Sequence, residues 1–294
     1  MRVLVFGGSG FLGSAVLRQL VRERHQTFNF DLVASKVEKV TDYIGNVLNA
    51  PDIVDVVLHV KPEAVFNFAG LAGIEECSAK PLTALKVNVL GNANILNALT
   101  FWKNGNSGRY IYASSMYVYA RNDLPYSITK RAAESMVRHY SNRYGFPYVI
   151  LRYGTIYGPG ARKGNSIRDI VANALETKII SLYGGGEEIR SYVHVDDAAR
   201  MSVEMLEGGY DNEAVVLTGR ESVKAKDLAL MLRDILGKEY QIEFRHDFPV
   251  DHYCVTPYCW KPDLAVSLSP NPGRDFAAGL LEVVGEVYSG RAKK

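Results

Sequence analysis

The stretch that decides the fold is residues 2–6, with the sequence RVLVF, followed by residues 7–13, with the sequence GGSGFLG. The apolar run predicts a buried strand, and the glycines have the spacing G-x-x-G-x-x-G before an amphipathic helical pattern over 10–23. Glycines let the backbone turn tightly and approach a pyrophosphate, and a helix N-terminus supplies unpaired N–H groups. The stretch therefore predicts a dinucleotide site, with a glycine-rich turn without ligand as the alternative. The residues expected to line the cofactor are Gly7, Gly10, Phe11, Leu12 and Gly13.

Outward from this stretch, the first half of the chain alternates short apolar runs with longer helical patterns. Strands are predicted at residues 2–6, 27–30, 64–68, 109–113 and 148–153, and helices at 10–23, 81–99 and 126–144. Strands that alternate with helices predict parallel pairing through crossover connections. The fold class expected is therefore α/β, with a doubly wound parallel sheet.

The second half of the chain has a different pattern from about residue 157 onward. Loops rich in Gly and Pro, at 157–160 and 184–186, accompany helices expected at 167–176, 195–207, 225–236 and 275–285. We expect a dinucleotide-binding domain over residues 1–156, rejoined by about 189–217. Residues 157–188 together with 218–294 should form a smaller, mixed C-terminal substrate-binding region that covers the carboxyl edge of the sheet.

Composition limits the class of protein. Of the 294 residues, 47% are hydrophobic and 22% are charged, which is ordinary for a globular protein with a substantial core. Lys and Arg number 34 against 32 Asp and Glu, so the total charge points to neither nucleic acid nor a membrane surface. No apolar run is long enough to span a bilayer, and Cys77, Cys254 and Cys259 fit neither a disulfide framework nor a zinc site. We expect a soluble cytoplasmic protein without a metal, nucleic-acid or membrane partner.

An acidic residue, Asp31, follows the second predicted strand. A carboxylate at this place can accept a hydrogen bond from an adenosine ribose 2′-hydroxyl and repels a 2′-phosphate, which favours NAD over NADP. A strand-end turn residue is the alternative reading of the same position. The nearby Lys36 and Lys39 keep NADP open as a second choice.

A tyrosine and a lysine, Tyr126 and Lys130, are spaced four residues apart in a predicted helix, so their side chains share one face. A free tyrosine titrates near pH ~10, and an adjacent ammonium group favours the phenolate, which makes the pair suitable as a general base. Ser115 follows the preceding strand and would hydrogen-bond the reacting oxygen. A surface helix with an exposed lysine is the alternative, but the glycine-rich turn upstream favours catalysis.

Five further motifs follow in order along the chain, at residues 68–71 (FAGL), 88–92 (NVLGN), 114–119 (SSMYVY), 151–159 (LRYGTIYGP) and 190–197 (RSYVHVDD). With the Tyr126 and Lys130 pair, they resemble the extended short-chain dehydrogenases/reductases, and among these the NAD-dependent epimerases and dehydratases similar to UDP-galactose 4-epimerase. The resemblance covers most of the chain and implies a Rossmann fold, NAD as cofactor, and a catalytic triad of Tyr126, Lys130 and Ser115. The cofactor contacts that it implies are Asn46, Val47, Phe68, Ala69, Gly70, Asn88, Tyr126, Lys130 and Tyr153.

The chain departs from the pattern of that family at positions that bear on the substrate. Thr155 replaces an asparagine that contacts the phosphates of the nucleotide sugar. Only ten residues separate Ser115 from Tyr126, which implies a more open or differently shaped sugar pocket. Arg190 is the candidate for a substrate phosphate, because a guanidinium fork binds phosphate through two hydrogen bonds; an ordinary ion pair is the alternative.

Polar aromatic residues and histidines gather between residues 244 and 262. By the resemblance this region contacts the substrate, together with Ser115, and its candidates are His252 and Tyr253. A packed aromatic cluster is the alternative. His194, which precedes a pair of aspartates, is expected to be a structural histidine at a helix cap.

The function implied by the resemblance is an NAD-dependent nucleotide-sugar 4-epimerase that works through a transient 4-keto intermediate, with Tyr126 as the general base. A dehydratase of the family carries an acid pair directly after the serine position, where this chain has Met116 and Tyr117. A nucleotide-sugar 4-ketoreductase or dehydratase is the alternative, and a non-catalytic NAD-sensing protein is a further one. The resemblance also implies a homodimer through helices 81–99 and 126–144, with outer apolar residues Leu85, Leu96, Met136 and Tyr140.

Overall fold

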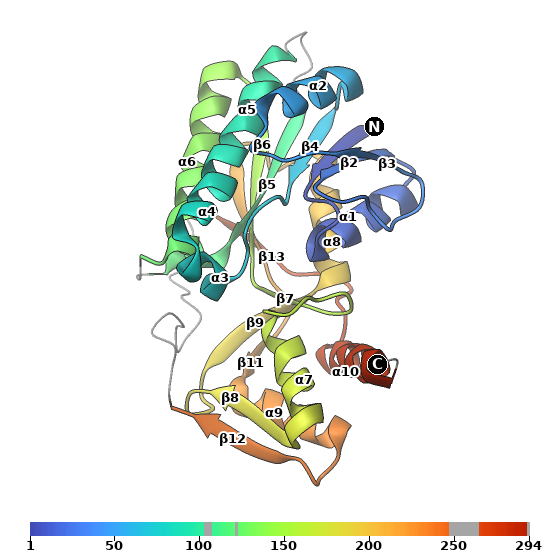
Figure 1. The fold of residues 1–294 in the computed structure, drawn as a ribbon, viewed down its shortest axis with the longest axis vertical. Helices are drawn as coiled ribbons and strands as arrows, with labels where there is room; N and C mark the ends of the chain where they lie inside the picture. Colours follow the sequence, from blue (N-terminus) through green and yellow to red (C-terminus); the bar gives the residue numbers. More distant parts are fainter. Residues whose placement is uncertain (103–107, 121–122, 247–264, 293–294) are drawn as a thin grey trace.

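The centre of the molecule is one large parallel sheet. The computed structural model describes residues 1–102, 108–120, 123–246 and 265–292 (Figure 1). Among these residues, eight strands are paired in the order β13-β10-β6-β5-β4-β1-β2-β3, and every pair is parallel. The order reverses between β1 and β4, the place where sheets of this kind bind ligands beyond their carboxyl ends. The bounds of the strands are β1 Arg2–Phe6, β2 Gln26–Asp31, β3 Val40–Ile44, β4 Ala64–Asn67, β5 Arg109–Ser115, β6 Tyr148–Tyr153, β10 Glu213–Leu217 and β13 Val266–Leu268.

Helices cover both faces of this sheet (Figure 1). On one face α1 (Phe11–Arg22) packs against α8 (Val195–Glu204). On the other face α5 (Asn92–Phe101) contacts both α2 (Ala50–Val60) and α6 (Pro125–Tyr144). None of the helices in the described ranges is both long and apolar enough to cross a membrane.

The central strands are buried on both faces, which explains the continuous apolar runs in the sequence. In β1, Leu4 and Phe6 belong to the core shared with α2, α5 and α6. Val3 and Val5 belong to the core shared with α1 and α8. All four side chains are fully buried, so the RVLVF run forms a central strand.

A second group of elements lies beyond the carboxyl ends of the large sheet (Figure 1). Its strands are β7 (Thr155–Tyr157), β9 (Ile189–His194) and β11 (Ser222–Lys224) in one sheet, and β8 (Ile179–Tyr183) with β12 (Gln241–Arg245) in another. Its helices are α7 (Ser166–Thr177), α9 (Ala225–Leu236) and α10 (Phe276–Ala292), which share a separate core with these strands. Between β12 and α10 the chain returns to the large sheet as β13. The domain boundaries stay a prediction.

The predicted fold class is confirmed, and all five predicted strands are present. In the first half of the chain the sequence analysis missed β3, α2 and the short helix α3 (Ile74–Ala79), and it gave bounds for none of the strands that follow β6. Strand β3 lies at the edge of the sheet and has no fully buried residue, so its apolar pattern is weak. Helix α2 was missed although its buried residues Ile53, Val56, Val57 and Val60 have the helical spacing i, i+3, i+4, i+7.

The predicted helix 81–99 is confirmed as one uninterrupted helical stretch over residues 81–101, but its middle turn is π-helical. The chain forms α4 (Pro81–Leu85), a π-helical turn at Lys86–Gly91, and α5. In this turn the Asn88 side chain accepts the Leu71 N–H at 2.8 Å and donates to the Leu71 carbonyl at 3.1 Å. A Cβ on Gly91 would lie 2.7 Å from the Val47 side chain. Tertiary contacts of this kind at a helix turn are what sequence periodicity does not report.

Gly7 and Gly145 offer a matched test of how closely the glycine-rich turn approaches the rest of the sheet. Both have positive φ, at 79° and 74°, but a Cβ on Gly7 would lie 2.5 Å from the Ala69 nitrogen, whereas nothing lies within 4 Å of one on Gly145. Gly145→Ala should lower the free energy of unfolding by about 1 kcal/mol through backbone strain alone. Gly7→Ala should lower it by roughly twice as much or more, measured by urea unfolding. Equal losses would show that the turn tolerates a side chain.

Candidate functional site

The glycine-rich turn lies at the carboxyl end of β1 and leads into α1. The Gly7 N–H donates to the Phe30 carbonyl at 3.0 Å, which joins the turn to β2. A Cβ on Gly13 would lie 2.2 Å from the Gly7 carbonyl oxygen. Helix α1 begins after Gly10 without a side chain that caps its first N–H groups, so these donors suit an anionic group. The helix opens with the predicted residues Phe11, Leu12 and Gly13.

Asp31 ends β2 beside this turn. One of its carboxylate oxygens accepts the Ser9 N–H at 2.9 Å, and the other accepts the Leu32 N–H at 2.7 Å. Asp31 therefore holds the glycine-rich turn against the end of β2, a structural role that the sequence analysis did not find. Its predicted hydrogen bond with a ribose hydroxyl stays a prediction.

Asn46 and Val47, two predicted cofactor residues at positions where the resembled family contacts adenine, follow β3. The Asn46 side-chain oxygen accepts the Leu48 N–H at 2.9 Å, so it stabilises a local turn. Val47 is buried in the core, and its carbonyl accepts a hydrogen bond from Asn94 at 3.0 Å. Both residues have structural roles here, and their contact with adenine stays a prediction.

The loop after β4 holds three of the predicted cofactor residues, Phe68, Ala69 and Gly70. It passes directly behind the glycine-rich turn, because the Ala69 nitrogen lies 2.5 Å from the place of a Cβ on Gly7. It also reaches the helix α6 side, because a Cβ on Gly70 would lie 2.8 Å from Asn88 Oδ1 and 3.9 Å from Lys130 Nζ. The structure thus brings the predicted cofactor residues of four separate motifs into one region.

The three predicted catalytic residues come from two neighbouring elements. Tyr126 and Lys130 are in α6, Ser115 ends β5, and all three are buried. Lys130 Nζ lies 5.9 Å from the centre of the Tyr126 ring and donates to the Ala113 carbonyl of β5 at 2.7 Å. Ser115 Oγ accepts the Tyr117 N–H at 3.2 Å, and the Tyr117 and Tyr126 rings lie 5.8 Å apart. These contacts bring the end of β5 against the first turns of α6.

Burial affects how readily Lys130 loses its proton. Desolvation lowers the pKa of its ammonium group from 10.5 to about 8, against the opposing influence of Cys77 and Glu134. Burial also raises the pKa of the neighbouring Cys77 thiol to about 11. Lys130 therefore changes charge close to the pH at which enzymes work, while Cys77 stays a neutral thiol there.

A buried ion pair behind these residues was missed by the sequence analysis. Glu134 and Arg152, only 2% and 6% exposed, share two hydrogen bonds at 2.9 and 2.6 Å. Ser114 donates to Glu134 at 2.7 Å, and Arg152 donates to the Tyr119 hydroxyl at 2.6 Å. Burial alone would raise the pKa of Glu134, but the hydrogen bonds and the charge of Arg152 outweigh it and lower that pKa. In the sequence, the only indications of this ion pair were a carboxylate one helical turn after Lys130 and an arginine in the LRY motif.

Of the predicted substrate residues that the structure describes, Thr155 and Arg190 lie on the smaller three-stranded sheet, whereas Ser115 ends β5 of the large sheet. Thr155 begins β7 and pairs with Tyr192 of β9, two residues after Arg190 on the same strand. Arg190 is partly buried. His252 and Tyr253 fall outside the described residues, so their contact with a substrate stays a prediction.

Two buried side chains near this sheet have structural partners. Tyr153, predicted to contact the cofactor, has its hydroxyl 2.7 Å from Ser202 Oγ in the core, and burial raises its pKa. That predicted contact stays a prediction. His194 Nδ1 accepts the Asp196 N–H at 3.3 Å and caps α8, which confirms its predicted structural role. Burial lowers the pKa of His194 and favours its neutral form.

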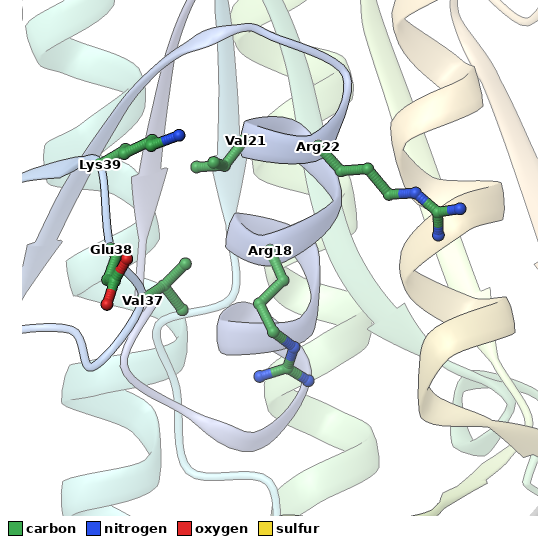
Figure 2. A pocket seen from close by; sticks show the side chains of 6 residues that line it. All are labelled: Arg18, Val21, Arg22, Val37, Glu38 and Lys39. Carbon is green, nitrogen blue, oxygen red and sulfur yellow. The ribbon is translucent and has the colours of Figure 1, made fainter.

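A pocket of about 280 Å³ lies elsewhere, between α1 and the segment that precedes β3 (Figure 2). None of the predicted catalytic residues lines it. Figure 2 shows that the Lys39 side chain points toward α1, whereas the Arg22 side chain extends away from Lys39 and Glu38, so these charged groups do not converge. Its lining residues are Arg18, Val21, Arg22, Val37, Glu38 and Lys39.

Comparison with known proteins identifies the family. The model of the NAD dependent epimerase/dehydratase family matches residues 3–217. The chain belongs to this epimerase/dehydratase family. Its cofactor is accordingly NAD, and it is an enzyme of the group that acts on nucleotide sugars.

Relatives and solved structures of this family agree with the fold. The dTDP-glucose 4,6-dehydratase 1 of Escherichia coli (strain K12) is 26% identical over 281 residues, which cover 81% of this chain and 77% of that protein. The UDP-glucose 4-epimerase of Thermotoga maritima, solved with UDP-glucose, has a TM-score of 0.83 and 22% identity over 99% of this chain and 100% of that one. The UDP-glucose 4-epimerase of Thermus thermophilus, solved with NAD, has a TM-score of 0.81 and 21% identity over 98% of this chain and 99% of that one.

The lowered pKa of Lys130 makes the stability of this enzyme depend on pH. The value is about 8 in the folded protein and 10.5 for an ordinary lysine, so between these values the unfolded chain binds more protons. The free energy of unfolding contributed by Lys130 therefore rises with pH through this window. Lys130→Met should remove the rise and stabilise the protein without cofactor at neutral pH. Urea unfolding of both proteins from about pH 7 to about pH 10 measures this, and parallel curves would contradict a buried ammonium group.

Proposed function

We propose that this enzyme is an NAD-dependent nucleotide-sugar 4-epimerase, which acts through a transient 4-keto sugar with Tyr126 as the general base. The buried group of Tyr126, Lys130 and Ser115 and the fold shared with UDP-glucose 4-epimerases support the proposal. The observation that carries it is the chemistry of the residues directly after Ser115.

No acid follows Ser115 at the place where a dehydratase needs one. Met116 and Tyr117 begin a 3-10 helix, Met116–Tyr119, that starts at the end of β5. The first carboxylate after them in the sequence is Asp123, whose side chain is 79% exposed and pairs with Arg131. Elimination of water from a sugar requires an acid beside the leaving hydroxyl, whereas epimerisation at C4 does not. The residues present therefore favour epimerisation.

The glycine-rich turn fits NAD on the evidence of its own packing. A side chain on Gly13 would collide with the Gly7 carbonyl oxygen, and no side chain caps α1. We expect this turn to hold the pyrophosphate, Asp31 the adenosine ribose, and the loop after β4 with Lys130 the nicotinamide side. When bound, NAD accepts a hydride from the sugar and returns it.

The residues of α6 and β5 supply the proton chemistry of the proposed reaction. Tyr126 takes the proton of the sugar 4-hydroxyl and later gives it back. The Lys130 ammonium, 5.9 Å from the centre of the Tyr126 ring, favours the phenolate form of that tyrosine. Ser115 hydrogen-bonds the reacting oxygen. Their burial keeps the surrounding dielectric low, which strengthens each of these electrostatic effects.

A 4,6-dehydratase is the second candidate, because curated relatives carry that name. It would need an acid from outside the segment after Ser115. Glu75 and Glu76 lie on α3, which packs against α6, but both are exposed. A 4-ketoreductase would use the same residues and differ in releasing its cofactor at every turnover.

A panel of substrates tests the proposal directly. The purified enzyme with NAD is incubated with UDP-, GDP-, CDP- and dTDP-sugars, and the products are followed by NMR. A 4-epimer formed without net change in NAD supports the proposal. A 4-keto-6-deoxy sugar would establish the dehydratase instead, and stoichiometric oxidation of NADH or NADPH would establish a reductase.

Replacement of Tyr126 tests the general base. Tyr126→Phe should lower turnover of the true substrate by at least roughly 10²- to 10⁴-fold, because the proton-transferring oxygen is lost. NAD binding should stay nearly unchanged, because the ring remains. Tyr140→Phe, in the same helix, is the matched control and should keep its rate. Near-normal turnover by Tyr126→Phe would assign the base to another group, with Tyr117 and Tyr119 as the nearest candidates in the sequence.

We propose that the enzyme is a homodimer that pairs α4, α5 and α6 with the same helices of a second chain. Leu85 of α4 and Ile128 of α6 are exposed, by 48% and 41%, and α4 packs against α6. Met136 and Tyr140 are partly buried against the core. Leu96 was predicted for the same surface, and that expectation is wrong: its side chain is fully buried and covers the sheet.

Light scattering tests the proposed dimer. The wild-type protein should have the mass of two chains at micromolar concentration. Leu85→Asp should shift it toward one chain, because an unpaired carboxylate is costly to bury in an interface. Leu281→Asp, at an exposed leucine of α10, is the control and should stay dimeric. A wild-type mass of one chain would contradict the proposal.

A further inference from the structure

The loop between β7 and α7 crosses from the smaller sheet to the glycine-rich turn. Arg162 of this loop donates a hydrogen bond from Nη2 to the Ser9 carbonyl at 2.9 Å. A Cβ on Gly160 would lie 3.8 Å from the Phe11 ring at the start of α1. Two residues of the loop thus meet two residues of the predicted cofactor turn, although about 150 positions separate them in the sequence.

The loop is held in this place from its other side. The Gly160 N–H donates to both carboxylate oxygens of Glu286 in α10, at 3.0 Å each. Within the loop, the Asn165 N–H donates to the Arg162 carbonyl at 3.1 Å, and the Gly164 N–H donates to Asp169 at 2.6 Å. The position of Arg162 over the turn is therefore supported by α7 and α10.

The charge of Arg162 is not balanced by a neighbouring acid. Among the carboxylates in the described ranges, none lies within ion-pair distance of it, whereas Arg168 six residues later pairs with Asp169 at 2.9 Å. Arg162 is exposed, and its guanidinium has further N–H donors besides the one used by Ser9. A cation with spare donors beside a turn that suits an anion is arranged to bind that anion.

We propose that Arg162, held against the glycine-rich turn by the Ser9 carbonyl, also binds the pyrophosphate of NAD and so retains the cofactor. Ser9 lies within the turn itself, which favours the cofactor pyrophosphate over the diphosphate of the sugar substrate as the partner of Arg162. Release of NAD then requires Arg162 to leave the turn. The proposal depends on NAD, the cofactor of the family, and on neither the sugar nor the 4-epimerase reaction.

The rate of cofactor release tests this proposal. The full chain is loaded with NADH, mixed with excess NAD, and followed by NADH fluorescence in wild type, Arg162→Gln, Arg162→Lys and Lys163→Gln. Arg162→Gln should release NADH roughly 10- to 100-fold faster, because a charge-assisted hydrogen bond to phosphate is lost. Arg162→Lys, which keeps the charge but not the fork, should lie between it and wild type. Lys163→Gln, at the adjacent exposed lysine, should change the rate less than twofold, because an exposed surface charge contributes little.

Two outcomes would overturn the proposal. The first is a release rate for Arg162→Gln that equals that of Lys163→Gln. The second is an unchanged NADH release rate together with weakened UDP binding, measured by calorimetry, which would assign Arg162 to the substrate. Because Arg162 is exposed, we expect its variants to fold, and thermal unfolding checks this. Failure of the enzyme to epimerise any sugar would leave these measurements unaffected.

Discussion

The buried ion pair between Glu134 and Arg152 is the interaction on which the arrangement of the site depends. Two charges taken out of water are costly unless each finds several partners. Here Ser114 and Arg138 also bind Glu134, and Tyr119 accepts a hydrogen bond from Arg152. The pair joins α6 to the carboxyl ends of β5 and β6, so Glu134 fixes the helix one turn away from Lys130, the proposed catalytic lysine. Loss of one partner from such a pair typically costs about 3–5 kcal/mol.

The parallel sheet supplies the other constraint. Because the strands all run in one direction, the residues that follow them meet at one edge. The glycine-rich turn follows β1, Asp31 ends β2, the loop of residues 68–70 follows β4, and Ser115 ends β5. Residues far apart in the sequence therefore form one site without long excursions of the chain, and α6 brings Tyr126 and Lys130 to the same edge.

The sequence predicted best those parts whose pattern has a single physical reading. RVLVF followed by GGSGFLG predicts a buried strand, a tight turn and a helix, and the structure has all three. The π-helical turn at Lys86–Gly91 was not predictable in this way, since it depends on contacts of Asn88 and Gly91 with distant segments. Helix α2 was predictable, because its buried residues Ile53, Val56, Val57 and Val60 have the spacing of one helix face.

Contacts between distant segments also limited what the sequence could predict about the site and the surface. The local spacing of Tyr126 and Lys130 identified a pair that the structure places beside β5, but nothing local marked Glu134 as the partner of Arg152, 18 residues away. Leu96 likewise has an apolar side chain that would suit an interface as well as a core. Only the packing of α5 on the sheet decides that it is buried. Predictions that rest on which way a helix face turns need the tertiary structure.

The order of the strands has a consequence for synthesis on the ribosome. The strands β3-β2-β1-β4-β5-β6 come from one continuous segment that ends at Tyr153, so this part of the sheet can assemble while the remainder of the chain is still being made. β10 and β13 then add to the β6 edge, which is an unpaired strand edge until they emerge. At that stage of synthesis α6 is already present while one edge of the sheet is open to wrong partners, and the late strands close that edge.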